Sequence, residues 1–301
     1  MIYVVKSLSL NGGGNKIFRS GDEVTERDFK PGRFHTLISA GHIVIKQDAQ
    51  IVEPTPTDKT QFTVAISTAV WRRYDVFAMF AEGIKELQHE FPNIKFITIV
   101  AGSEGQKSKA AAELFGFQYI EIPNDPLAAK FNITTALAKK HNPDYVLCLG
   151  SDDIIHPSLM RLYVSAMQRG YDFIGIEDMY FWDTVSGKCL YWGGYRDARR
   201  KGHTAGAGRL ISSRLMSAWG WAPWEIRHSK VLDNSMQGKL SRTPHSRLSI
   251  NIRAAGAFAL DIKSETNMTP FERWDNSEFI DPEIIQDQFQ YLPICAVSQQ
   301  S

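Results

Sequence analysis

Residues 61–149 alternate short β-type runs with longer helical patterns, and this alternation restricts the chain to a small set of folds. The first run, 62–66, precedes a segment at 70–91 whose apolar residues have helical spacing. Two further runs, 94–100 and 118–122, are each followed by a helical pattern in the same way. Strands and helices that alternate at this spacing predict an α/β fold with a doubly wound, mainly parallel sheet.

The fourth run of the series, Tyr145 to Leu149, is apolar throughout and is soon followed by two adjacent carboxylates, Asp152 and Asp153. Continuous apolar character is typical of a strand that is covered on both faces. In a doubly wound sheet, ligands bind outside the carboxyl ends of the strands, so we expect the two acids at the ligand-binding edge. Carboxylates held there suit Mg²⁺ or Mn²⁺. The alternative is that one of them caps the helix that opens at Pro157.

The composition excludes several classes of protein. With 301 residues, 43% hydrophobic and 22% charged, the chain can form one large domain and a small one, or two modest domains. Its apolar runs are far shorter than the roughly 20 residues that cross a bilayer, and no signal-peptide pattern opens the sequence. Three widely spaced cysteines fit neither a disulfide framework nor a zinc cluster. We therefore expect a soluble, cytoplasmic protein with no membrane span.

Changes in sequence character divide the chain into four parts. Residues 1–48 mix short apolar stretches with turn-rich polar sequence and predict a small α+β module. Residues 49–60 contain Glu53-Pro-Thr-Pro-Thr57, a composition that favours an extended linker. The main domain is predicted at 61–271, with a second half rich in tryptophan and glycine, and a polar C-terminal tail at 272–301.

The motifs of the main domain, taken in order, resemble those of GT-A fold glycosyltransferases, particularly the broad family 2 type. The resemblance covers about residues 62–270. Its pieces are Ala65-Ile-Ser-Thr68, Lys130-Phe-Asn132, Leu149-Gly-Ser-Asp-Asp153, Gly206-Ala-Gly208 and Leu232-Asp233. It implies an inverting, hexosyltransferase-like enzyme that uses Mn²⁺ or Mg²⁺ and transfers a sugar from a nucleotide-diphosphate sugar, a UDP-sugar in the first instance, to an acceptor hydroxyl.

The resemblance implies that the two acids bind the metal ion that bridges the donor diphosphate and contact the ribose. In the family an acid precedes them where this chain has Gly150, so either Asp152 or Asp153 could be the direct metal ligand. Histidine is a common third ligand, and the candidates are His203, His228 and His245. For each histidine alone, a surface or packing role is the more frequent one.

The resemblance also implies a nucleotide site at the ends of the first strand and the third helix. Its predicted residues are Ser67, Thr68, Arg72, Arg73, Lys130 and Asn132. An arginine can bind a phosphate through two parallel hydrogen bonds. The alternatives are a helix cap for the hydroxyl residues, solvated arginines, and a solvent-facing stripe on the helix. Gly206 and Gly208 are expected to let the backbone approach the donor sugar, and the run from Leu260 to Pro270 to form the far wall of the donor site.

Asp233 is the candidate general base, and Glu225 is its rival. An inverting transfer needs a carboxylate that takes the proton of the acceptor hydroxyl. Both acids follow Trp219-Gly-Trp-Ala-Pro-Trp224, whose indole rings suit stacking against a sugar or a nucleobase. The alternative is that the tryptophans belong to the core and that Asp233 caps a helix.

The N-terminal module resembles small domains of phage proteins. The matching segments are Lys6-Ser-Leu-Ser-Leu-Asn-Gly12, Gly21-Asp-Glu-Val24 and Ala40-Gly-His-Ile43. This resemblance implies a docking role and a bacteriophage origin, with the host cytoplasm as the location. The acceptor would then be a modified base in phage DNA, with Arg199, Arg200 and Lys201 on its phosphates, or a cell-surface glycan. A non-catalytic phage structural or binding protein that keeps the fold is the alternative to an enzyme.

Overall fold

A computed structural model describes residues 3–5, 9–13, 16–19, 22–40, 42–45, 50–197, 200, 202–226, 232–265, 271 and 277–294. The chain forms two compact units. One comprises Met1–Gln50 with Leu240–Arg242, and the other comprises Ile51–Lys239 with Thr243–Ser301.

The first unit is a small α+β module with its own apolar core. Strand β1 (Tyr3–Val5) pairs antiparallel with β4 (Glu23–Val24) and β5 (Ile43–Ile45). The other elements are the hairpin of β2 (Ser9–Asn11) and β3 (Ile17–Arg19), the 3-10 helix η1 (Glu26–Asp28) and helix α1 (Arg33–Ser39). Phenylalanine, leucine, isoleucine and valine fill the core, at Val5, Val24, Phe29, Phe34, Leu37 and Ile43.

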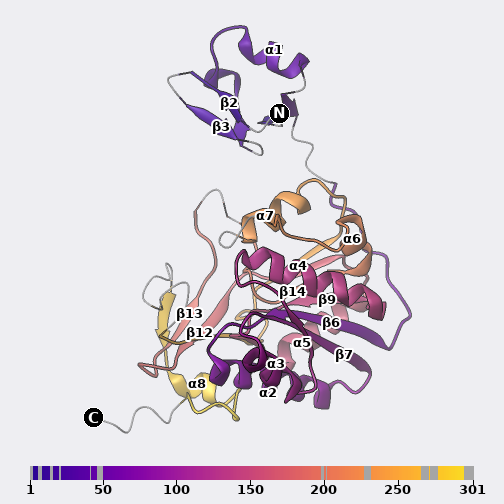
Figure 1. Ribbon diagram of the computed structural model, residues 1–301, viewed down its shortest axis with the longest axis vertical. Coiled ribbons are helices and arrows are strands. Elements are labelled where there is room, and N and C mark those ends of the chain that lie inside the picture. Colours follow the sequence, from indigo (N-terminus) through magenta and orange to yellow (C-terminus); the bar gives the residue numbers. More distant parts are fainter. Residues whose placement is uncertain are drawn as a thin grey trace. The chain divides into compact units, whose positions relative to one another are not determined.

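A seven-stranded sheet forms the centre of the second unit (Figure 1). Its strands, in spatial order, are β15 (Arg247–Ile250), β11 (Phe173–Ile176), β14 (Arg209–Ser212), β9 (Tyr145–Cys148), β6 (Phe62–Ala69), β7 (Ile94–Gly102) and β8 (Gln118–Glu121). All neighbouring strands pair parallel except β14, which runs antiparallel to β9 and to β11. The prediction of an α/β fold with a mainly parallel sheet is confirmed.

Helices cover both faces of this sheet, as the doubly wound prediction requires (Figure 1). Helix α4 (Leu127–Ala138), which continues into η2 (Lys139–His141), lies on one face. Helices α2 (Tyr74–Glu90), α3 (Gln106–Glu113) and α5 (Pro157–Gln168) lie on the other. The buried face of α2 includes Val76, Phe77, Phe80, Ile84 and Leu87, the apolar residues whose spacing predicts the helix. No helix among the described residues has the length and apolarity needed to cross a membrane.

A second sheet of five strands packs against the first half of the unit. Its order is β10 (Asp153–Ile155), β16 (Ala259–Lys263), β12 (Met179–Asp183), β13 (Cys189–Trp192) and β17 (Ser277–Ile280). Three short helices complete the unit: α6 (Ser213–Ala218), α7 (Leu232–Leu240) and α8 (Pro282–Gln286). Because β10 begins at Asp153, this sheet starts directly at the predicted acid pair.

The structure corrects the expectation of a C-terminal appendage. Residues 277–294 belong to the second unit, since β17 pairs antiparallel with β13 and Ile285, Phe289 and Leu292 are buried. These apolar residues are widely spaced in a polar sequence, so the sequence does not indicate that they belong to the core. Residues 51–60, predicted as a linker, lie along the same unit, where the amide of Thr57 donates to the carbonyl of Gln168 at 2.8 Å.

Candidate functional site

The candidate site lies where the chain reverses its direction of travel across the sheet. From the central strand β6 the chain moves outward to β7 and β8, and it then returns to place β9 on the other side of β6. The loops after β6 and β9 therefore leave neighbouring strands at the carboxyl edge of the sheet, which is where the ligand-binding crevice of an open α/β fold lies. Ser67 of β6 and Cys148 of β9 are register partners, so both strands end at the same level.

An ion pair spans this crevice. Nη1 of Arg73, in the loop after β6, lies 2.9 Å from Oδ2 of Asp152, in the turn after β9. Arg72 and Arg73 both have positive φ, of 56° and 44°, a conformation that costs energy for residues other than glycine and clusters at functional sites. Neither acid caps helix α5, because His156 does so and accepts from the amide of Ser158. The capping alternative is thereby excluded.

Asp153 faces a third carboxylate, Asp261, which the sequence analysis includes only as part of the predicted far wall of the donor site. The two are register partners on β10 and β16, and both are 9% exposed. Oδ2 of Asp261 pairs with Nζ of Lys263 at 2.6 Å, whereas its Oδ1 is buried without a hydrogen-bond partner. Burial, followed by the charges of Asp261 and Asp152, raises the pKa of Asp153 well above its usual range. Burial raises the pKa of Asp261 to about 6, against the opposing effect of Lys263.

The absence of a side chain at residue 150 shapes this acid cluster. A Cβ atom at Gly150 would lie 2.6 Å from Oδ1 of Asp152 and 2.7 Å from Oδ2 of Asp153. The amide of Gly150 also donates to Oδ2 of Asp153 at 2.6 Å. The two acids therefore fold back over the position where the family pattern has another acid.

The carboxylates fit a divalent cation by their chemistry. Mg²⁺ and Mn²⁺ favour carboxylate oxygens, and the unpartnered, buried Oδ1 of Asp261 is an acceptor of this kind. Within the described part of the chain, no three His, Cys, Asp or Glu side chains are arranged to hold a metal ion by themselves.

Ser67 and Thr68 lie at the crevice, but their side chains are almost fully buried. Oγ of Ser67 is 2.5 Å from Oγ1 of Thr134 on α4, and Oγ1 of Thr68 is buried without a partner. Neither residue caps a helix. Their part in nucleotide binding stays a prediction, and it would have to involve backbone atoms or a shift of the hydroxyl groups.

Lys130 holds loops of the protein together through hydrogen bonds. In this structure its side chain points neither to solvent nor to a ligand site, the two arrangements considered from the sequence. Its side chain is fully buried on α4, because three loops at the sheet edge surround its Nζ. Nζ donates to the carbonyl of Val70, to Oγ of Ser103 and to Oδ1 of Asn124, at 3.2, 2.9 and 2.8 Å. Burial lowers the pKa of Lys130 to about 8. The lysine thereby connects the loops that follow β6, β7 and β8.

Asn132 is likewise an internal clamp. Its Nδ2 donates to the carbonyl of Trp224 at 2.8 Å, and its Oδ1 accepts from the amide of the same residue at 3.1 Å. Trp219, Trp221 and Trp224 are buried, as the core alternative predicts. Binding of a nucleotide by the Asn132 side chain would require both hydrogen bonds to open.

Asp233 lies in the first turn of α7 and is held on both carboxylate oxygens. Oδ1 is 3.3 Å from Nη1 of Arg209, and Oδ2 is 3.4 Å from Nη2 of Arg200. The hydroxyl of Tyr195 donates to Oδ2 at 3.3 Å. A Cβ at Gly206 would lie 2.6 Å from Oδ1, so this glycine leaves room for the carboxylate.

Glu225 is exposed to solvent, whereas Gly208 lies beside strand β9. Glu225 is exposed, and its backbone amide donates to Oγ of Ser235 at 2.7 Å. Gly208 has a φ of 72°, which favours glycine, and its amide donates to the carbonyl of Cys148 in β9. The Gly206–Gly208 loop thus lies beside the end of the acid-bearing strand.

Of the candidate histidines, the two that the structure describes, His203 and His245, do not extend the acid cluster. His203 lies near three arginines, which together with burial lower its pKa. His245 is buried, and its Nδ1 lies 2.8 Å from the carbonyl oxygen of Thr243. His228, Arg199 and Lys201 are outside the described residues, as are residues 266–270 of the predicted far wall. The described part of that run includes Asp261 and Lys263.

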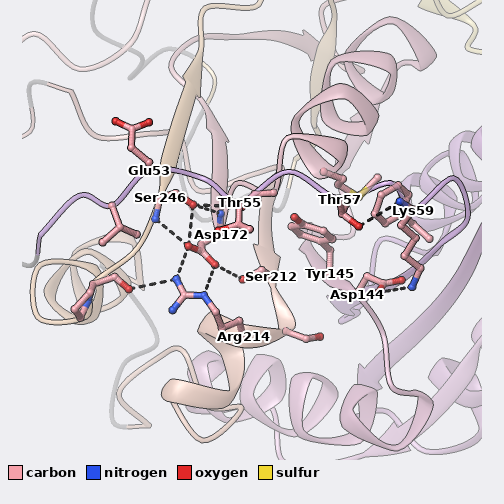
Figure 2. A pocket seen from close by; sticks show the side chains of 16 residues that line it. Glu53, Thr55, Thr57, Lys59, Asp144, Tyr145, Asp172, Ser212, Arg214 and Ser246 are labelled. Carbon is pink, nitrogen blue, oxygen red and sulfur yellow. Dashed lines mark hydrogen bonds and ion pairs between the residues drawn. The ribbon is translucent and has the colours of Figure 1, made fainter.

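A cavity of about 390 Å³ lies at the opposite, amino edge of the sheet, and Figure 2 shows its lining. Two of its acids are paired: Asp172 with Arg214, Ser212 and Ser246, and Asp144 with Lys59. Because residues 52–59 form one wall, we interpret this cavity as the joint between that segment and the sheet.

Arg209 is the site residue that the sequence analysis misses, and Asp261 and Lys263 are included only as members of the predicted far wall, without a role of their own. Asp261 and Lys263 occupy alternate positions of a short strand, Ala259–Lys263, that otherwise reads as apolar. Charged residues at i and i+2 of such a strand share one face, and this spacing is the signal that could have identified them. Arg209 follows the glycine loop directly and has no comparable signal.

No family model matches the sequence, and no curated protein matches it. Among solved structures, the chain is similar to S. aureus TarS 1–349, at 11% identity and a TM-score of 0.44, over 69% of this chain and 59% of that one. It is also similar to the mannosyltransferase PcManGT from Pyrobaculum calidifontis in complex with GDP-Man and Mn²⁺, at 9% identity and a TM-score of 0.47, over 76% and 63%. The chain thus spans about three fifths of the length of both proteins.

Proposed function

We propose that this chain is a GT-A type glycosyltransferase that transfers a sugar from a nucleotide-diphosphate sugar, a UDP-sugar in the first instance, to an acceptor hydroxyl. The observation that carries the proposal is the ion pair of Arg73 and Asp152 across the switch point of the sheet. A guanidinium group and adjacent carboxylates at one crevice provide partners for a diphosphate and for its metal ion.

The residues divide into groups that act on different parts of the reaction. Arg72 and Arg73 bind phosphate oxygens, and Asp152 and Asp153 hold Mn²⁺ or Mg²⁺ near the buried Oδ1 of Asp261. Such an ion, when bound, neutralises the charge that develops on the leaving diphosphate. The glycine loop at 206–208 gives the donor sugar room beside β9.

Asp233 takes the proton of the acceptor hydroxyl, as an inverting transfer requires, and Glu225 is the alternative base. The carboxylate of Asp233 is oriented by two guanidinium groups and the hydroxyl of Tyr195. Exposed Glu225 has the easier access to solvent, so separate substitution of the two acids decides between them.

The acceptor is, in this proposal, a modified base in phage DNA, with a cell-surface glycan as the alternative, and the N-terminal unit docks the enzyme to another phage protein. A second candidate function is a non-catalytic phage protein that keeps the fold. Gly150 favours it, because an acid of the family pattern is absent there.

The test is a panel of nucleotide-sugars incubated with the protein, with and without Mn²⁺, in which nucleotide release is measured by chromatography. We expect slow, Mn²⁺-dependent hydrolysis of one donor, and a reduction of about 100-fold or more in Asp152→Asn and Asp153→Asn. Asp287→Asn, an exposed acid in the C-terminal segment, is the matched control and keeps the wild-type rate. Absence of hydrolysis with every donor, together with no Mn²⁺-dependent thermal shift by UDP, would favour the non-catalytic protein.

A further inference from the structure

Two guanidinium groups, those of Arg200 and Arg209, hold Asp233, and all three of Arg200, Arg209 and Arg247 lie near His203; we call these three residues the arginine cluster. Arg209 is 3% exposed, so its charge is almost entirely removed from water. It shares the carboxylate of Asp233 with Arg200, at 3.3 and 3.4 Å. A buried guanidinium is costly unless opposite charge compensates it, and one carboxylate divided between two arginines compensates only part of it.

The remaining hydrogen bonds of the arginine cluster go to neutral groups or are missing. Nη2 of Arg209 donates to the carbonyl of Thr204 at 3.1 Å, and Nη2 of Arg247 donates to the carbonyl of Gly202 at 2.6 Å. The Nε atoms of all three arginines are buried without a hydrogen-bond partner. A buried donor without a partner is destabilising, so their concentration at one place calls for a ligand that supplies acceptors.

Titration of the neighbouring groups reflects the same surplus of positive charge. Burial, followed by the charges of Arg247, Arg200 and Arg209, lowers the pKa of His203. Burial and the charge of Arg209 lower the pKa of Arg247 itself. Glu177 opposes this effect at Arg247 and Asp197 opposes it at His203, but the arginine charges are the larger ones, so positive charge predominates here and an anion is stabilised.

Arg209 lies at the same edge of the sheet as the acid pair, on the other flank of β9, whereas Arg247 begins β15 level with Phe173 at the start of β11. Arg209 opens β14 and is the register partner of Cys148 in β9, whereas the crevice with Arg73 lies between β9 and β6. The residues of the arginine cluster come from the second half of the unit. A ligand there adjoins the donor crevice and is distinct from the part of the donor held by the loop after β6.

We propose that the arginine cluster binds a phosphate group of the acceptor and so places the acceptor hydroxyl next to Asp233. The inference rests on the proposed function for the identity of the acceptor, but the anion site itself does not. Arginine is the side chain best matched to a phosphate, because its planar donors meet two oxygens at once. The ring of Tyr195, whose centroid lies 3.5 Å from Cζ of Arg200, holds this guanidinium group in place.

The experiment titrates inorganic phosphate into the full-length protein at constant ionic strength and follows the thermal midpoint and the binding heat. We expect saturable stabilisation of the wild type, and affinity reduced about tenfold in Arg200→Gln, whose side chain is 33% exposed and can be replaced without a cavity. Arg196→Gln, an exposed arginine of the same segment, removes the same charge and keeps wild-type affinity. Asp233→Asn releases both guanidinium groups and should bind phosphate several-fold more tightly.

Two results would overturn the proposal. One is the absence of phosphate binding by the wild type, or an equal loss in Arg196→Gln and Arg200→Gln. The other is a loss of Mn²⁺-dependent UDP binding in Arg200→Gln, since the arginine cluster would then serve the donor diphosphate. Failure of the proposed function has a different signature: no donor is hydrolysed, while phosphate binding and its dependence on Arg200 and Asp233 persist.

Discussion

Gly150 illustrates how one missing side chain arranges a site. The carboxylates of Asp152 and Asp153 lean into the space that a Cβ atom would fill, and the backbone amide of Gly150 binds one of them. The glycine has an ordinary φ, so its role is the space and not the backbone conformation. A residue that departs from the family pattern thus has a physical function of its own.

At this scale we predict that Gly150→Ala displaces both carboxylates. The added methyl group should lower the free energy of unfolding by about 1–3 kcal/mol and weaken Mn²⁺-dependent UDP binding by about tenfold. Urea unfolding and thermal shift measure the two effects. Gly13→Ala is the control, because its Cβ would make only an ordinary contact, at 3.7 Å. Unchanged UDP binding in a folded Gly150→Ala variant would show that the position of the acids is not critical.

The sequence indicates Asp152 and Asp153 because two acids directly follow an apolar strand. It does not single out Asp261, which reaches the same place through the pairing of β10 with β16. The sequence shows that Lys130 and Asn132 are unusual polar residues on an apolar helix. It does not show where their side chains point, because the sequence does not indicate which face of such a helix is exposed to solvent. Both side chains point inward and form hydrogen bonds to neighbouring loops.

Among the elements, three strands are joined at the amino edge of the sheet by one carboxylate. Asp172, just before β11, accepts from Ser212 at the end of β14, from Arg214 on α6, and from the amide and hydroxyl of Ser246 before β15. Burial raises the pKa of Asp172, but the hydrogen bonds from Arg214, Ser246 and Ser212 outweigh it and hold the pKa below its usual range. The ionised form therefore stabilises this edge.

We predict that Asp172→Ala lowers the free energy of unfolding at pH 7 by about 3 kcal/mol, because five donors, two of them on Arg214, lose a buried acceptor. A carboxyl whose pKa is depressed in the folded state stabilises above its unfolded value and loses that effect as the pH falls through the folded one. The difference from the wild type should thus be constant near neutrality and shrink below about pH 4. Urea titrations from pH 3 to 7, with exposed Glu113→Gln as control, would contradict this if the difference did not change.

The elements of the first half follow the sequence closely, since each is long or bounded by clear turn residues. The patterns at 62–66 and 94–100 correspond to β6 and β7, which extend two or three residues further. The second half is less predictable. Strands such as β10, β14 and β15 are short and carry charged residues, and only their pairing with distant strands makes them extended.

In the whole molecule, every predicted site residue belongs to the second unit. We therefore predict that removal of residues 1–50 leaves Mn²⁺-dependent UDP binding within about twofold of the full-length chain. Thermal shift over a range of UDP concentrations measures this, and circular dichroism controls for folding. A folded truncated protein that no longer binds UDP would assign the first unit a part in the donor site.

The ion pair of Arg73 and Asp152 has a consequence for the energetics of binding. In the free protein each group serves as the counter-ion of the other. A ligand that offers only negative charge must draw Arg73 away from Asp152. A cation that binds alone must draw Asp152 away from Arg73. A ligand that supplies both charges replaces the pair completely. The binding free energies of the cation and of the diphosphate should therefore not be additive, and each should raise the affinity for the other.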